Sequence, residues 1–165
     1  MCSKRVKLTI RDKIPVDKVS LPMNGNKDAI RVLVADGNAT FLHIAADVFR
    51  LYPELDLVGT ASTPDQILVL AQELCPQVIL IDLNSPGLFN VELIARLRYL
   101  LPNVGIIALS LLDAKGVYCQ MALNIGADDL VDKGALVTDL LPAIQRVIGR
   151  KKAGKLDSSP NEAGK

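Results

Sequence analysis

The chain has 165 residues, of which half are apolar and 22% are charged, and its net charge is +1. This length suits one ordinary α/β domain with tails rather than two full domains. The balanced charge gives no general electrostatic reason to expect a nucleic-acid or membrane partner, and no apolar run is long enough for a membrane span or a secretion signal.

Both ends of the chain differ in character from its middle. Over residues 6–11 apolar and polar residues alternate as in one short strand, and prolines and an Asn-Gly-Asn cluster follow, so residues 1–28 are predicted to be an extension and linker. Residues 151–165 are rich in Gly, Ser, Lys and Pro without apolar periodicity, which is typical of a disordered tail. The folded domain is therefore expected over residues 29–150.

Within that domain, short apolar runs alternate with segments of helical periodicity. In chain order we expect strand 31–35, helix 38–51, strand 55–60, helix 64–74, strand 77–83, helix 89–101, strand 104–109, helix 113–125, strand 129–132 and helix 135–148. The run at 77–83 is apolar without alternation, as expected of a strand buried on both faces. Five strand–helix units in series require crossover connections, and hence a parallel sheet covered on both sides.

Residues with useful chemistry follow the ends of these strands. Asp36 follows the first strand and Asp82 lies near the end of the third, while Ser110 follows the fourth and Lys133 the fifth. Ligands bind at the carboxyl ends of the strands in such sheets, so we expect these residues to share one cleft. A carboxylate nucleophile, a second acid for a divalent cation, a hydroxyl and an ammonium together indicate phosphoryl transfer.

The segments VLVADGNAT, ELDLVGTAST, VILIDLNSPG, VGIIALS and GADDLVDKGA resemble the receiver domains of bacterial two-component response regulators. The likeness runs from about residue 30 to residue 148 and is strongest to the NarL/LuxR-type subgroup, whose receivers are often fused to helix-turn-helix domains. It implies a CheY-like, flavodoxin-like doubly wound (βα)5 fold with strand order 2-1-3-4-5. It also implies a cytoplasmic phosphoprotein that regulates rather than acts as an enzyme.

The resemblance gives each of these residues a role. Asp82 matches the phosphoacceptor, Ser110 matches the switch hydroxyl, and Lys133 matches the lysine that binds the phosphoryl group. The implied cofactor is Mg²⁺, held by Asp36, Asp82 and the backbone carbonyl of Asn84.

Three positions depart from the family pattern. Gly37 stands where the family has a second acid that binds the metal directly, so we expect weak Mg²⁺ binding. Leu130 stands where the family has a Tyr or Phe that couples the site to the output face, and Leu111 stands where a small residue is common. These changes bear on the switching step more than on the fold.

Two hypotheses about function follow from the resemblance. In the first, a histidine kinase or phosphorelay protein phosphorylates Asp82. A downstream protein then reads the change on the face formed by the fourth helix, fifth strand and fifth helix, where a homodimer is a further option. This is a stand-alone receiver, because the 15 or so residues after the last helix are too few for a helix-turn-helix domain. In the second, Gly37 and Leu130 mark a degenerate receiver that acts as a phosphorylation-independent interaction or dimerisation module.

Simpler interpretations of single residues stay open, and so does a third class of function, an enzyme or cofactor binder of the same layered architecture. Asp36 would serve as a cap of the first helix, a role that Asn38 would share, and the basic residues near the C-terminus would complement a helix dipole. A phosphatase of the haloacid-dehalogenase type needs a second Asp two residues after its nucleophile, where this chain has Asn84. A mononucleotide binder needs a better phosphate loop than DGNAT.

Overall fold

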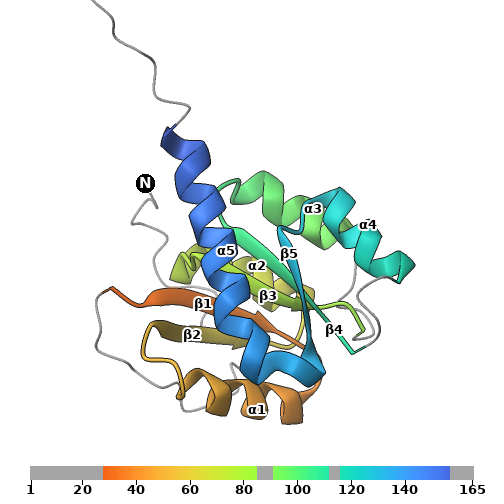
Figure 1. The fold of residues 1–165 in the computed structure, drawn as a ribbon. Helices are drawn as coiled ribbons and strands as arrows, with labels where there is room; N and C mark the ends of the chain where they lie inside the picture. Colours follow the sequence, from red (N-terminus) through yellow and green to blue (C-terminus); the bar gives the residue numbers. More distant parts are fainter. Residues whose placement is uncertain (1–27, 85–90, 112–115, 157–165) are drawn as a thin grey trace, which may run out of the picture.

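The computed structural model describes residues 28–84, 91–111 and 116–156. Within them, five parallel strands form one sheet in the order β2-β1-β3-β4-β5, which confirms the predicted doubly wound fold (Figure 1). The strands are β1 (Ile30–Ala35), β2 (Leu55–Ala61), β3 (Val78–Asp82), β4 (Gly105–Ser110) and β5 (Asp129–Asp132).

Helices cover both faces of this sheet. They are α1 (Ala39–Phe49), α2 (Pro64–Leu74), α3 (Val91–Leu100), α4 (Val117–Ile125) and α5 (Leu136–Leu156), with a short 3-10 turn, η1 (Lys133–Ala135), before α5. The apolar residues of α1 and α5 share one core with alternate residues of the strands, such as Val32 and Leu80. Those of α2, α3 and α4 share a second core with the intervening strand residues, such as Leu33 and Ile79. Every residue of β3 and β4 is buried, as their uninterrupted apolar sequences predict.

Local signals set the helix ends. The Asn38 side chain accepts a hydrogen bond from the Phe41 N–H and so caps α1, while the Thr63 side chain caps α2 with Pro64 in the first turn. Helix α4 ends at Gly126, whose φ of 133° favours glycine. The predicted helix starts near residues 89 and 113 lie outside the described residues, and so does the extension at residues 1–27.

The last helix differs from the prediction. Helix α5 continues to Leu156, so the prediction of a disordered tail from residue 151 is wrong for 151–156, and residues 157–165 lie outside the described part. The additional turns are tied down by ion pairs from Arg150 and Lys151 to the acidic residues Asp129 and Asp128 at the start of β5. Figure 1 shows these turns extending past the sheet.

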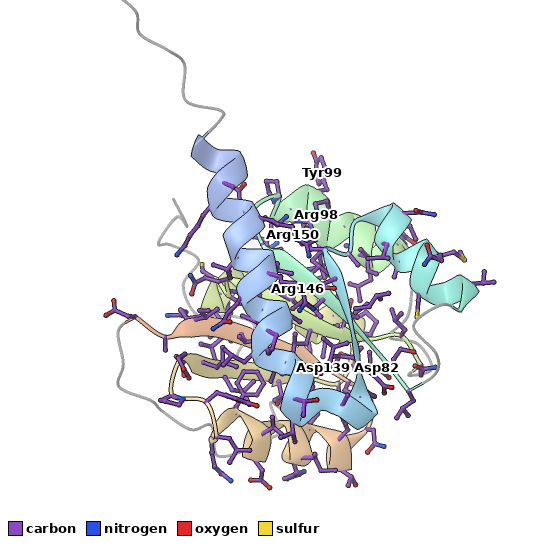
Figure 2. All side chains as sticks on the ribbon, in the orientation of Figure 1. Asp82, Arg98, Tyr99, Asp139, Arg146 and Arg150 are labelled. Carbon is purple, nitrogen blue, oxygen red and sulfur yellow. The ribbon has the colours of Figure 1, made fainter. Side chains whose placement is uncertain are left out.

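A charged network joins several elements at the amino-terminal rim of the sheet. Arg98 of α3 donates hydrogen bonds to the carbonyl oxygens of Pro102, Val104 and Gly126 and contacts the Asp128 carboxylate at 2.7 Å. Asp128 also accepts a hydrogen bond of 2.8 Å from the Ile106 N–H in β4. Figure 2 shows Arg98 well away from Asp82, so the network lies apart from the predicted site.

In the described part of the chain, no helix combines the length and apolar character needed to cross a membrane.

Candidate functional site

Strand register brings the predicted residues to one rim of the sheet. Ala35 of β1 pairs with Ile81 of β3, so Asp36 and Asp82 come next to each other where these two central strands end. Asp82 pairs in turn with Leu109 of β4, and Ser110 pairs with Asp132 of β5. Because Ser110 and Lys133 each directly follow these pairs, all four residues reach the same carboxyl-terminal rim, where Figure 2 labels Asp82.

Lys133 joins the two carboxylates. Its Nζ atom lies 2.9 Å from Asp82 Oδ1 and also forms an ion pair with Asp36 Oδ2. The lysine side chain is 5% exposed and the two aspartate side chains are 0% and 2% exposed. Burying a charge destabilises the folded protein unless the charge is paired, so Lys133, Asp36 and Asp82 each need the others as partners.

The backbone after each strand also contacts the carboxylates. Asp36 Oδ1 accepts a hydrogen bond of 2.8 Å from the Asn38 N–H, and Asp82 Oδ1 accepts one of 3.2 Å from the Asn84 N–H. These turns orient one oxygen of each carboxylate along the rim. Asn38, rather than Asp36, caps α1, so the plainer interpretation of Asp36 as the helix cap is wrong.

The remaining predicted positions lie around this cluster. Ser110 is buried, Gly37 is exposed, and Leu130 is partly buried and packs against the core shared by α2, α3 and α4. The Leu111 side chain is exposed, and its N–H donates a hydrogen bond of 3.2 Å to the Asn84 side chain. That bond connects the ends of β3 and β4.

The donor set is compatible with a minimal magnesium site. Mg²⁺ binds through one or two carboxylates and keeps several waters, and Asp36 and Asp82 supply two carboxylates that both contact Lys133 Nζ. Among the described residues, no group of three or more His, Cys, Asp or Glu side chains is placed to hold a metal ion. Gly37 contributes no carboxylate of its own.

Sequence reasoning missed one neighbour of the site. Phe41 falls within the predicted helix 38–51, and its ring lies over Lys133 Nζ, 4.2 Å from ring centroid to nitrogen. The signal that could have found it is its place in the first turn of α1, five residues after Asp36, where an α1 side chain can reach the rim.

Residues 32–145 match the family model described as response regulator receiver domain. Among curated proteins, the chain is 27% identical over 135 residues to protein-glutamate methylesterase/protein-glutamine glutaminase 1 of Caulobacter vibrioides, covering 82% of this chain and 39% of that protein. It is 28% identical over 120 residues to the transcriptional regulatory protein MctR of Rhizobium johnstonii, covering 73% of this chain and 56% of that protein. The match thus spans less than two thirds of these relatives.

Solved structures agree with the sequence matches. The response regulator domain of Thermotoga maritima CheB superposes with a TM-score of 0.67 at 26% identity, covering 73% of this chain and 97% of that one. The signal receiver domain of the putative response regulator NarL from Mycobacterium tuberculosis superposes with a TM-score of 0.64 at 25% identity, covering 76% and 98%. In both cases nearly the whole of the solved domain is matched.

Proposed function

The chain belongs to the response regulator receiver domain family, and from this we propose that Asp82 accepts a phosphoryl group from a histidine kinase or phosphotransfer protein. Receiver domains are regulatory, interact with such donors and with downstream effectors, and generally bind Mg²⁺ at their acidic pocket. The observation that supports the proposal is the ion pairing of Lys133 with both Asp36 and Asp82 at the carboxyl-terminal rim.

The chemistry needs a nucleophile that is both oriented and charged. An Asp82 carboxylate oxygen attacks the phosphorus of a phosphohistidine, the new P–O bond forms as the P–N bond breaks, and the electron pair of that bond returns to the imidazole. The product on Asp82 is an acyl phosphate. The Asn84 N–H and the Lys133 ammonium both contact Oδ1 of Asp82, and these contacts orient the carboxylate for the attack.

Charge that develops on the phosphoryl oxygens has to be neutralised. We propose that the Lys133 ammonium and the Ser110 hydroxyl do this by binding the phosphoryl oxygens. Asp36, Asp82 and the Asn84 carbonyl would hold Mg²⁺, which supplies further positive charge beside these oxygens when bound. Because Gly37 adds no carboxylate, we propose that this binding is weak.

We propose further that the signal passes through protein contact rather than through catalysis. The face formed by α4, β5 and α5 is the proposed contact surface for a downstream protein or a second copy of the chain. A stand-alone role and a cytoplasmic location belong to this proposal as well.

Leu130 favours a second candidate function. Its side chain packs partly buried against the core, and it has no ring or hydroxyl to report on the phosphorylated site. A degenerate receiver, which binds its partner without phosphorylation, would keep the fold and lose this coupling. The two functions differ in whether Asp82 reacts.

Phosphorylation is tested directly with Mg²⁺ and a small-molecule phosphodonor. We expect the intact mass of the protein to increase by one phosphoryl group, and the gain to disappear in Asp82→Asn. Asp65→Asn, an exposed carboxylate in the first turn of α2, is the matched control and should still be labelled. No labelling of the parent protein at millimolar Mg²⁺ would favour the degenerate receiver, whereas turnover of a phosphoester substrate would favour an enzyme.

A further inference from the structure

Phe41 and Lys133 form a contact that the family resemblance does not assign. Phe41 lies in the first turn of α1 and Lys133 lies in η1, 92 positions further along the chain. The lysine Nζ atom is 4.2 Å from the centroid of the phenyl ring, which is within the range of a cation–π interaction. The contact therefore links α1 to the segment after β5 directly at the site.

The ring completes the surroundings of the ammonium. Two sides of Lys133 Nζ face the carboxylates of Asp36 and Asp82, and the ring face of Phe41 covers a third. The lysine side chain is 5% exposed, so water contributes little to holding it in place. An aromatic face attracts a cation without accepting a proton, and so it holds the ammonium without adding negative charge to the site.

Packing against the apolar core does not by itself account for an aromatic side chain at position 41. Phe41 is partly buried and packs against the core of α1 and α5 from its edge, whereas Phe49 on the same helix is fully buried within that core. An aliphatic side chain would fill the space that Phe41 fills at the edge of the core. It would not attract the ammonium.

We propose that Phe41 is a positioning residue, whose ring face holds the Lys133 ammonium between Asp36 and Asp82 at the point where phosphoryl oxygens bind. The inference rests on the proposed function for its consequence, because a well-placed ammonium matters most when a phosphoryl group arrives. The juxtaposition of ring and ammonium does not depend on that function. The two can therefore be tested separately.

Three variants isolate the ring. Phe41→Leu removes the aromatic face and keeps an apolar side chain, and Phe41→Tyr keeps the face. Phe49→Leu removes a ring from the same helix without touching Lys133, and so it controls for a general loss of stability. Thermal unfolding of each variant establishes that it is folded before any binding measurement.

The first readout is the NMR signal of the Lys133 side chain in the absence of ligand. Protons above an aromatic face are shifted upfield, so we expect the Lys133 ε-methylene and ammonium signals to move downfield in Phe41→Leu and to stay near the parent positions in Phe41→Tyr and Phe49→Leu. Unchanged Lys133 signals in Phe41→Leu would overturn the proposal, whether or not the protein can be phosphorylated.

The second readout is the affinity for beryllofluoride with Mg²⁺, measured by amide chemical shifts. We expect Phe41→Leu to bind about three- to tenfold more weakly than the parent and the other two variants to bind as the parent does. Equal affinity of Phe41→Leu and the parent would overturn the positioning role. If the parent itself fails to bind beryllofluoride, the phosphoacceptor function fails, and the Lys133 signals still decide the contact.

Discussion

The Asn84 side chain accepts a hydrogen bond of 3.2 Å from the backbone N–H of Leu111. Asn84 follows β3 and Leu111 follows β4, so this bond joins the segments after these two strands at the carboxyl-terminal rim of the sheet. The backbone N–H of Asn84 meanwhile donates to Asp82 Oδ1. One residue thus contacts both the proposed nucleophile and the chain segment directly after Ser110.

Asn84→Ala should loosen the backbone at Leu111 while leaving the Asn84 carbonyl in place. Leu111 is an exposed residue whose N–H donates this hydrogen bond, so we expect the bond to protect the N–H from exchange. We expect its hydrogen exchange, measured by NMR, to accelerate about fivefold, as loss of a bond of about 1 kcal/mol implies. Asn124→Ala, on the exposed side of α4, should leave it unchanged. Equal exchange in both variants would mean that the bond does not order this segment.

Gly37→Asp should strengthen Mg²⁺ binding. The new carboxylate would stand next to Asp36 at the rim and add a third acid to the donor set, which should raise the affinity by about tenfold or more. The chain has no tryptophan, so calorimetry or amide chemical shifts are suitable measurements. Gly149→Asp adds the same charge on the exposed face of α5 and should have no effect. An unchanged affinity in Gly37→Asp would show that residue 37 does not occupy the ligand position.

The Asp128 carboxylate should make stability depend on pH. Burial by itself would raise the pKa of Asp128, but the hydrogen bond from the Ile106 N–H and the contacts with Lys151 and Arg98 outweigh it and hold the pKa below its ordinary value. A carboxylate with a lowered pKa stabilises the fold above its unfolded pKa and loses that contribution as pH falls through the folded one. We therefore expect Asp128→Asn to cost about 2 kcal/mol at pH 7 and less below about pH 4.

Denaturant unfolding at several pH values provides this measurement. Asp47→Asn is the matched control. Asp47 of α1 pairs with Arg50 at the end of this helix, and both side chains are exposed, where ion pairs contribute little to stability. A cost for Asp128→Asn that stays the same from pH 7 to pH 3 would contradict the role of the charged carboxylate.

Alanine substitutions at two glycines should change the stability of the protein in opposite directions. A Cβ at Gly105 of β4 would come within 2.5 Å of Val147 Cγ1 on α5, so Gly105→Ala should force the helix away and cost about 1–3 kcal/mol. A Cβ at Gly149, inside α5, would meet nothing within 4 Å. Gly149→Ala should therefore stabilise the protein by about 0.5–1 kcal/mol through helix propensity. Calorimetric unfolding of both variants tests the pair, and destabilisation by Gly149→Ala would show that α5 is distorted there.

Most of the fold could be predicted because β3 and β4 are buried on both faces and the helices have regular apolar spacing. The predicted ends of an element are less accurate where backbone hydrogen bonds in a neighbouring turn determine where the element begins. The fourth strand was expected at 104–109 and is Gly105–Ser110, since the N–H of Val104 bonds to Leu101 in the preceding turn. The length of α5 could not be predicted, because its final turns are held by ion pairs to Asp128 and Asp129 rather than by an apolar stripe.

The sequence predicts which residues lie at the site, but not which contacts they make. The rule that ligands bind beyond the carboxyl ends of parallel strands places Asp36, Asp82 and Lys133 together, and the structure brings these three into contact. Their chemical roles stay predictions. The ring of Phe41 and the side chain of Asn84 depend on the conformation of the turns after β1 and β3, which apolar periodicity does not determine.

The overhang of α5 has a mechanical consequence. From Val147, which packs against β4, to Leu156 the helix is about 13 Å long, so a tilt of about 10° at Val147 would displace its end by about 2 Å. The ion pairs of Arg150 and Lys151 connect the start of this overhang to Asp129, the first residue of β5, and to Asp128 just before it. A small shift of the edge strand β5 would therefore tilt the overhang and produce a larger displacement at its end.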